Sequence, residues 1–370
     1  MSWVVNRVRQ LRDFGQKVWV DDLRRGMLSG GELTRLIEDD GICGVTSNPA
    51  ILQKALAEDG SYQGEIRKLQ ASGATAQQVY ESLAMQDVRA AADELHRVFR
   101  NSDGYDGFVS LEVSPKLAFD TVGTIAEAQR LWRLLDRANV MIKVPATREG
   151  LPAVRQLVSD GIPVNVTLLF GEPRYREVVE AFMAGLEQRK SAGLPLHGIV
   201  SVASLFVSRI DTLVDRQLRK ISEPDGNQRA IALLGKAGVE VARFAYQVYK
   251  EVTASARWAA LAAHGARPQR LLWASTSAKD PAYSDVKYVD ELIGRDSITT
   301  VPLSTLAAYR DHGKPSPTLE TDPYEMATFP ADLLKLGIDL ERVSEQLEAE
   351  GIEKFASSME TLLAGLAHDR

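Results

Sequence analysis

The sequence of 370 residues has little cysteine and little histidine. Its single cysteine, Cys43, cannot form an intramolecular disulfide, which indicates a reducing compartment, and we expect it to be a small buried side chain. The five histidines are scattered, and none ends a predicted strand beside other ligands, so we expect no metal site. They are His96, His197, His264, His312 and His368.

Long hydrophobic runs and an excess of positive charge are also missing. No stretch approaches the roughly eighteen apolar residues that a membrane-spanning helix needs. Residues 1–7 have neither the apolar core nor the small-residue cleavage site of a secretory signal. The net charge of −6 argues against a nucleic-acid partner. We therefore expect a cytoplasmic protein that binds no membrane and no nucleic acid.

Short runs typical of β-strands alternate with helical patterns along most of the chain. We predict strands at 17–22, 42–47, 107–113, 139–145, 162–169, 198–203, 270–275 and 297–301. Helical patterns include 77–100, 125–137, 172–190, 205–220, 235–264 and 286–293. Eight strands alternating with helices predict an α/β fold in which a parallel sheet closes into a (β/α)8 TIM barrel.

The predicted barrel covers about residues 17–310. A polar connection with three prolines follows at 311–323, and apolar residues at helical spacing then predict extra helices at about 324–368. We expect these helices to pack on the barrel, so that residues 1–370 form one domain.

Lys143 lies in the middle of an apolar, strand-like run, residues 140–145. A charge is costly there unless it is paired or neutralised. Burial of an ammonium group lowers its pKa and produces a nucleophilic amine. We therefore interpret Lys143 as a lysine that forms a Schiff base. The alternative is a lysine that only pairs with a buried carboxylate.

Polar residues occupy the carboxyl ends of the other early strands, where TIM barrels keep their chemistry. Period-two alternation turns five of them inward, and these are Asp21, Ser110, Glu112, Asn165 and Thr167. Asn48 comes at the end of the second strand. Schiff-base chemistry on a ketose needs an amine, a proton shuttle and a base at the breaking carbon–carbon bond. This set can supply all three. Asp22 follows Asp21 directly, and a register error of one residue would exchange them.

Two later segments predict a phosphate site. Residues 204–209 lead into a helix and offer Ser204, a helix N-terminus and the guanidinium of Arg209. Ser275 and Lys279 follow the seventh strand. Loops after the late strands commonly bind phosphate in TIM barrels, so a sugar-phosphate pocket is indicated.

Taken together, these motifs resemble the transaldolase family. The matching runs are GVTSNPAI at 44–51, SLEV at 110–113, IKVPAT at 142–147, NVTLLF at 165–170 and SLFVSR at 204–209. The resemblance covers about residues 17–310. The run WASTSAKDP at 273–281 looks like the longer branch of the family.

The resemblance implies a role for each candidate residue. Lys143 would form the Schiff base, and Glu112 would transfer protons through a water held by Thr167. Asp21 would take the proton from the C4 hydroxyl as the C3–C4 bond breaks. The dihydroxyacetone fragment would be held by Asn48, Asn165 and Ser204, and the phosphate by Arg209 and Ser275.

The resemblance further implies transfer of a dihydroxyacetone unit from sedoheptulose 7-phosphate to glyceraldehyde 3-phosphate, giving erythrose 4-phosphate and fructose 6-phosphate. It implies no metal or organic cofactor and small sugar phosphates as the binding partners. We expect a monomer or a homodimer. Many family members carry an arginine where this chain has Ser277, and we expect Lys279 to replace that charge.

Three alternatives stay open at this stage. A fructose 6-phosphate aldolase would release free dihydroxyacetone, but such enzymes tend to carry Gln and Tyr where this chain has Glu112 and Phe206. A metal-dependent barrel hydrolase would need clustered ligands. A non-catalytic barrel could bind partners through its C-terminal helices.

Overall fold

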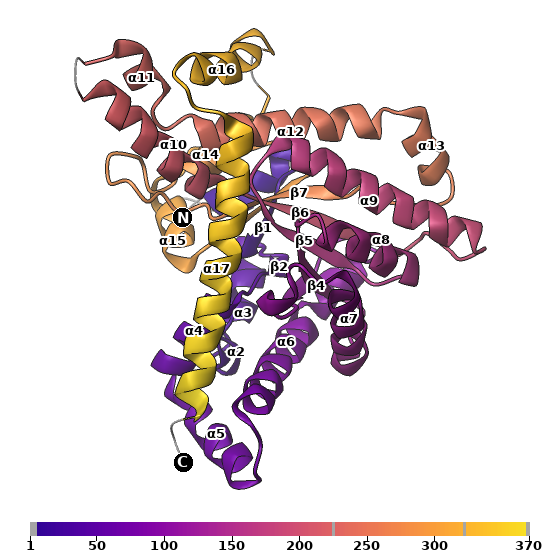
Figure 1. Ribbon diagram of the computed structural model, residues 1–370. Coiled ribbons are helices and arrows are strands. Elements are labelled where there is room, and N and C mark those ends of the chain that lie inside the picture. Colours follow the sequence, from indigo (N-terminus) through magenta and orange to yellow (C-terminus); the bar gives the residue numbers. More distant parts are fainter. Residues whose placement is uncertain (1–5, 224–225, 321–322, 368–370) are drawn as a thin grey trace, which may run out of the picture.

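The eight strands close into a single parallel barrel (Figure 1). The computed structural model describes residues 6–223, 226–320 and 323–367. Each strand pairs in parallel with the next, and the last pairs with the first. The strands are β1 (Lys17–Val20), β2 (Gly44–Val45), β3 (Phe108–Glu112), β4 (Val140–Pro145), β5 (Val164–Leu169), β6 (Ser201–Phe206), β7 (Arg270–Ala274) and β8 (Ser297–Val301). The predicted TIM barrel is confirmed.

Helices connect the strands and cover the outside of the barrel. The first group is α1 (Arg7–Gln10), α2 (Arg25–Ser29), α3 (Glu32–Arg35), α4 (Pro49–Glu58), α5 (Gln63–Ala71), α6 (Ala76–Asn101), α7 (Thr121–Leu135), α8 (Gly150–Asp160) and α9 (Glu172–Ser191). The second group is α10 (Val207–Ser222), α11 (Gln228–Leu233), α12 (Ala237–Thr253), α13 (Ala256–Ala262), α14 (Lys287–Asp290), α15 (Leu303–His312), α16 (Pro323–Lys335) and α17 (Leu340–Ala367). Single turns are η1 (Leu11–Phe14), η2 (Leu36–Asp40), η3 (Gly60–Tyr62) and η4 (Pro115–Leu117).

The predicted bounds of the sixth strand are wrong by three residues. Gly198 has φ +84°, a left-handed conformation that belongs to the turn before the strand, and β6 begins only at Ser201. Its pairing with β7 extends as far as Phe206 opposite Ala274. Ser204 therefore lies within the strand, and α10 begins directly after the strand at Val207.

The predicted helix at 235–264 is two helices. It breaks after Thr253, and the side chain of Ser255 accepts a hydrogen bond from the Trp258 amide and so begins α13. The helix that follows the second strand is α4. There the side chain of Asn48 accepts from the Ile51 amide, and Pro49 is the first helical residue of α4.

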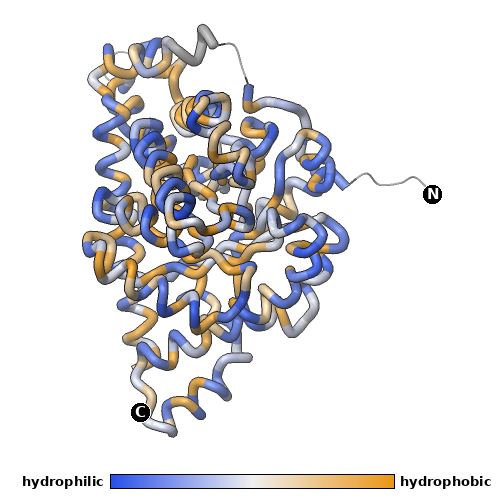
Figure 2. Tube along the Cα trace, turned by 90° about the vertical axis from the view of Figure 1, so that its right-hand side faces the viewer, coloured by the Kyte–Doolittle hydropathy of each residue, from blue (hydrophilic) through white to orange (hydrophobic). Residues whose placement is uncertain are grey.

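The strands are buried on both faces, as their nearly continuous apolar runs indicate. Figure 2 shows hydrophobic residues concentrated along the central strands, whereas the helices alternate between hydrophobic and hydrophilic stretches. Large buried side chains of the barrel include Trp19 in β1 and Arg270, the first residue of β7. A Cβ atom added to Gly44 would lie 2.3 Å from the Trp19 ring, so this position admits only glycine.

The extra C-terminal helices are α16 and α17. The long helix α17, drawn in yellow in Figure 1, crosses the barrel and contacts α4, α6, α10 and β5. Position 368 of the predicted range lies outside the described residues, and the assignment of residues 1–370 to one domain remains our prediction. In the part of the chain that the structure describes, no helix has the length and hydrophobicity needed to cross a bilayer.

Candidate active site

Lys143 lies near the carboxyl end of β4 and is only 3% exposed. Its Nζ donates a hydrogen bond of 3.0 Å to the backbone oxygen of Ser47 and lies 3.6 Å from Oε2 of Glu112. The strand register places Glu112, Lys143 and Asn165 side by side on β3, β4 and β5. The amine therefore has a carboxylate neighbour, but the contact is longer than a hydrogen bond, and the amine lines a cavity.

This cavity opens at the carboxyl ends of the strands and has a volume of about 130 Å³. Residues from seven of the eight strand ends line it, all but β3, together with the start of α10. The lining residues are Asp21, Thr46, Asn48, Lys143, Thr167, Ser204, Phe206, Arg209, Ala274, Ser275, Ser277, Lys279, Thr300 and Pro302. Eight of the ten predicted site residues are in this set. The other two, Glu112 and Asn165, contact members of it.

Glu112 and Thr167 belong to the two strands that flank β4, and both are buried. Burial raises the pKa of Glu112, while the charge of Lys143 opposes that rise. Oε2 of Glu112 and Oγ1 of Thr167 have no hydrogen-bond partner among the described residues. Buried polar atoms normally find a partner, so two unsatisfied oxygens on either side of the amine indicate a place where water or substrate binds.

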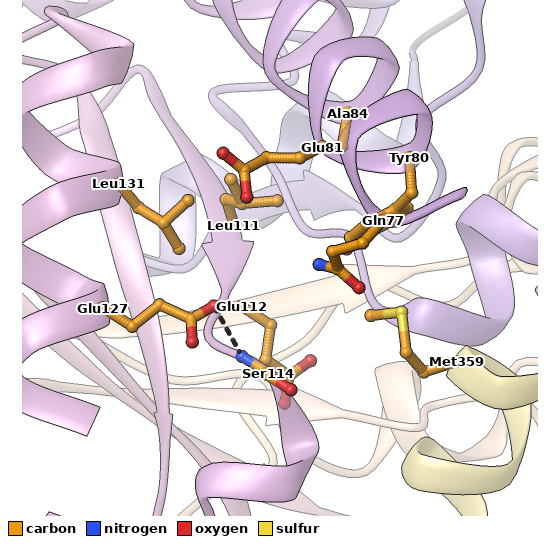
Figure 3. A pocket seen from close by; sticks show the side chains of 10 residues that line it. All are labelled: Gln77, Tyr80, Glu81, Ala84, Leu111, Glu112, Ser114, Glu127, Leu131 and Met359. Carbon is orange, nitrogen blue, oxygen red and sulfur yellow. Dashed lines mark hydrogen bonds between the residues drawn. The ribbon is translucent and has the colours of Figure 1, made fainter. Parts of the chain in front are cut away.

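A second, smaller cavity of about 20 Å³ lies beside Glu112, away from Lys143, between α6, α7 and α17 (Figure 3). Such a volume admits about one water molecule. On its wall, Oε1 of Glu127 accepts a 3.2 Å hydrogen bond from the Ser114 amide, two residues after Glu112. Burial raises the pKa of Glu127. This contact fixes the end of β3 and hence the position of the Glu112 carboxyl group.

Asp21, directly after β1, faces the cavity from the side opposite β4. Its Oδ1 accepts a 2.6 Å hydrogen bond from Oγ1 of Thr46, which in turn lies 2.8 Å from Oγ1 of Thr300. Burial raises the pKa of Asp21, whereas the Thr46 hydrogen bond and the charge of Lys143 lower it. Asp22 does not line this cavity. It lies 3.5 Å from Arg24 in a neighbouring groove.

The three residues predicted to hold the dihydroxyacetone fragment, Asn48, Asn165 and Ser204, differ from one another in their hydrogen bonds. Asn165 is fully buried and donates to Oγ of Ser110 at 3.1 Å, while it accepts from Oγ of Ser204 at 2.6 Å. Both ends of its amide are used, so Asn165 orients Ser204, which does reach the cavity. Asn48 uses its oxygen to cap α4 at 3.0 Å from the Ile51 amide, and it also lines the cavity.

Positive charge gathers at the other end of the cavity. Arg209, in the first turn of α10, has its guanidinium carbon 5.2 Å from the centre of the Phe206 ring. Oγ of Ser275 lies 2.8 Å from Oγ of Ser208, and Ser275 has φ +54°, which turns its hydroxyl toward the start of α10. Nζ of Lys279 donates to Oγ of Ser277. A helix N-terminus, a guanidinium, an ammonium and hydroxyls are the groups that bind anions in proteins, which agrees with the predicted phosphate site.

Two threonines that support Asp21, Thr46 and Thr300, are not among the predicted site residues. Both lie at strand ends, and the alternation that selected Asp21 would also have selected them. Phe355 of α17 is not among the predicted residues either, and its ring centre lies 5.8 Å from the Arg209 guanidinium carbon. Across the described ranges, no three histidine, cysteine, aspartate or glutamate residues gather in a way that could hold a metal ion.

Comparison with known proteins places this geometry in a family. Residues 18–366 match the family model described as transaldolase/fructose-6-phosphate aldolase. A transaldolase of Thermobifida fusca is 48% identical over 361 residues, which are 97% of each chain. A transaldolase of Thiobacillus denitrificans is 46% identical over 97% of this chain and 99% of its own length, and transaldolase 2 of a Nostoc species is 42% identical over 98% and 97%. The chain therefore belongs to the transaldolase/fructose-6-phosphate aldolase family.

Proposed function

We propose that the chain is a transaldolase, a transferase of the non-oxidative pentose phosphate pathway. It transfers a dihydroxyacetone unit from sedoheptulose 7-phosphate to glyceraldehyde 3-phosphate, giving erythrose 4-phosphate and fructose 6-phosphate. The observation that carries the proposal is the buried Lys143 amine, which lies between Glu112 and the cavity that Asp21 and Arg209 also line. Relatives matched over nearly their full length and named transaldolase support it.

The first step is imine formation. The Lys143 amine attacks the C2 carbonyl of the ketose, and the resulting carbinolamine loses water when its hydroxyl is protonated. Glu112 is placed to exchange this proton, since burial raises its pKa and keeps a proton on the carboxyl group closer to neutral pH. A water between Oε2 of Glu112 and Oγ1 of Thr167 would give both unsatisfied oxygens a partner.

Cleavage and transfer follow at the Asp21 side. The Asp21 carboxylate takes the C4 hydroxyl proton, the C3–C4 bond breaks, and its electron pair moves into the imine to give an enamine and an aldehyde. The enamine then attacks the acceptor aldehyde, Asp21 returns the proton to the new alkoxide, and water hydrolyses the imine. The hydrogen bond from Thr46 fixes the position of the Asp21 carboxylate at the cavity.

Trapping of the imine tests this proposal. We expect fructose 6-phosphate followed by borohydride to leave a stable three-carbon adduct on the peptide that contains Lys143. Lys143→Met is the matched control, because a neutral unbranched side chain suits the apolar strand, and it should fold normally yet give no adduct and no turnover. Active enzyme without an adduct, or a Lys143→Met variant with near-normal turnover, would exclude the Schiff base.

A simple aldolase is the nearest alternative within the family, and an assay without any acceptor aldehyde separates the two. A transaldolase should release at most one equivalent of glyceraldehyde 3-phosphate per active site and retain the three-carbon unit on Lys143. Continuous release of free dihydroxyacetone at a comparable rate would instead establish the aldolase reaction.

A further inference from the structure

The guanidinium of Arg209 is held by rings and not by acceptors. Arg209 is half-buried, and among the described residues it makes no hydrogen bond and no ion pair. Its guanidinium carbon lies 5.2 Å from the centre of the Phe206 ring and 5.8 Å from that of Phe355. Guanidinium groups bind aromatic faces in this way, and the attraction grows when the pair is shielded from water.

The two rings come from different parts of the fold. Phe206 ends β6, three residues before Arg209, whereas Phe355 belongs to α17, the helix that crosses the barrel. Phe355 is 2% exposed, so its ring is shielded from solvent at this contact. The guanidinium of Arg209 therefore contacts one ring from the barrel, Phe206, and one from the C-terminal helix, Phe355.

Gly351, one turn before Phe355, allows α17 to approach this closely. An added Cβ atom would lie 3.0 Å from Cδ2 of Leu168 and 3.4 Å from Nη1 of Arg209. Leu168 is itself buried in a left-handed conformation, φ +58°, beside Thr167, an arrangement that costs energy and persists only where packing enforces it. The same turn of α17 thus packs against both the Thr167 side and the Arg209 side of the cavity.

Attachments elsewhere along α17 do not depend on the ring of Phe355. Arg174 lies 3.5 Å from Glu348, Lys116 lies 3.6 Å from Glu360, and the helix end accepts a 2.9 Å hydrogen bond at Leu366 from Gln70. Removal of the ring should therefore leave the helix in place and free only the guanidinium.

We propose that α17 completes the phosphate end of the active site, with Phe355 as a positioning residue that holds Arg209 for a phosphorylated substrate. This inference rests on the proposed function and on the role of Arg209 in it. An arginine without acceptors of its own keeps all its donors for the phosphate, and the two rings supply the orientation that those acceptors would otherwise provide.

The test compares glyceraldehyde 3-phosphate with glyceraldehyde as acceptors, each with sedoheptulose 7-phosphate as the donor. We expect Phe355→Leu to lower kcat/KM for the phosphorylated acceptor about tenfold, mainly through KM, and to change it less than about twofold for glyceraldehyde. Phe355→Tyr, which keeps the ring, should restore most of the loss. Phe329→Leu removes another buried phenylalanine of the C-terminal helices and serves as the control for packing.

A double-mutant cycle with Arg209→Ala distinguishes positioning from packing. In the Arg209→Ala background, Phe355→Leu should cause no further selective loss. Equal losses on both acceptors, or a further tenfold loss in that background, would overturn the inference while leaving the proposed function intact. A wild-type protein that transfers to neither acceptor and forms no borohydride adduct would overturn the proposed function as well.

Gly351→Ala tests the same contact should Phe355→Leu fail to fold. The new methyl group would lie 3.4 Å from Nη1 of Arg209 and 3.0 Å from Leu168 while Phe355 is retained. We expect a selective loss on the phosphorylated acceptor, and unchanged discrimination between the two acceptors would contradict the proposal.

Discussion

Lys143 and Glu112 occupy the same register on neighbouring strands, and Nζ of the lysine lies 3.6 Å from Oε2 of the glutamate. The separation is too long for a tight ion pair and short enough for a proton to pass through one water. The Lys143 charge also opposes the rise in the Glu112 pKa that burial causes. The pair is thus arranged for proton exchange, and the opposite charges also favour each other in the folded protein.

The first prediction concerns this pair. Glu112→Gln keeps the shape of the side chain and removes its proton exchange, so we expect kcat to fall by about 10² to 10⁴. The step affected is imine formation, which stopped-flow mixing with fructose 6-phosphate and borohydride quenching would measure as slower adduct growth. Thr167→Val, which removes one unsatisfied buried hydroxyl, should slow the same step less and should not destabilise the fold.

One result would contradict the role of Glu112 in proton exchange. If Glu112→Gln forms the adduct at the wild-type rate, then Glu112 serves only as a charge partner for Lys143 and takes no part in imine formation.

The second prediction separates cleavage from imine formation. Asp21→Asn cannot take the C4 hydroxyl proton, so the imine should form but the C3–C4 bond should stay intact. Mass analysis after borohydride should then find a six-carbon adduct on Lys143 in place of the three-carbon adduct. Asp22→Asn is the matched control: Asp22 lies beside Arg24 outside the cavity, and turnover should stay within about threefold of wild type.

A three-carbon adduct in Asp21→Asn, combined with loss of turnover in Asp22→Asn, would show that Asp22, and not Asp21, takes the C4 hydroxyl proton. The structure argues against that outcome because Asp21, and not Asp22, accepts the hydrogen bond from Thr46.

Most of the fold could be predicted from local patterns in the sequence. Strand runs alternating with helical runs led to the barrel, because a parallel sheet of eight such units closes in one way, and strand parity placed Asp21, Glu112 and Lys143 together at one end. This parity is set by which residues of the run are apolar and face the helices, so it does not depend on where the strand begins or ends.

Contacts between distant segments could not be predicted in this way. The apolar run around β6 is longer than the strand, and only pairing with β7 sets where it begins, at Ser201. Nothing near Phe355 in the sequence indicates that its ring meets Arg209, because that contact depends on how α17 crosses the barrel. Such packing is decided by the whole surface of the barrel, and a single sequence does not display it.

The third prediction ranks the two cations at the phosphate end. Arg209→Ala should reduce kcat/KM for phosphorylated substrates about 10- to 100-fold, since a charge-assisted, half-buried contact is lost. Lys279 is exposed and hydrogen-bonded to Ser277, so Lys279→Met should cost less than about tenfold. Adduct formation with free dihydroxyacetone, which has no phosphate, should be nearly unchanged in both variants.

The reverse ranking would mean that Lys279, as the substitute for the family arginine, is the main phosphate ligand. Equal losses with phosphorylated and free substrates would contradict a phosphate role for either residue.

The fourth prediction concerns stability and pH. Asp211 of α10 is 1% exposed, and burial raises its pKa to about 6, although Oδ1 accepts from the Gly238 amide and Oδ2 from the Tyr288 hydroxyl. A carboxyl group whose pKa is higher in the folded state binds its proton more tightly there. Its contribution to stability is therefore complete below the unfolded pKa, near 4, and is lost as the pH rises through about 6.

Asp211→Asn keeps the shape of the side chain but cannot ionise, and its amide oxygen can still accept from the Gly238 amide while its amide nitrogen donates to the Tyr288 hydroxyl. Relative to this variant, the free energy of unfolding of the wild type should fall by up to about 3 kcal/mol between pH 4 and pH 7, since two pKa units correspond to that amount. Urea unfolding at several pH values measures the difference, and catalysis, which does not use Asp211, serves as the control for folding. Parallel stability curves for the two proteins across this range would show that Asp211 is ionised at no cost and that its hydrogen bonds to Gly238 and Tyr288 fully offset its burial.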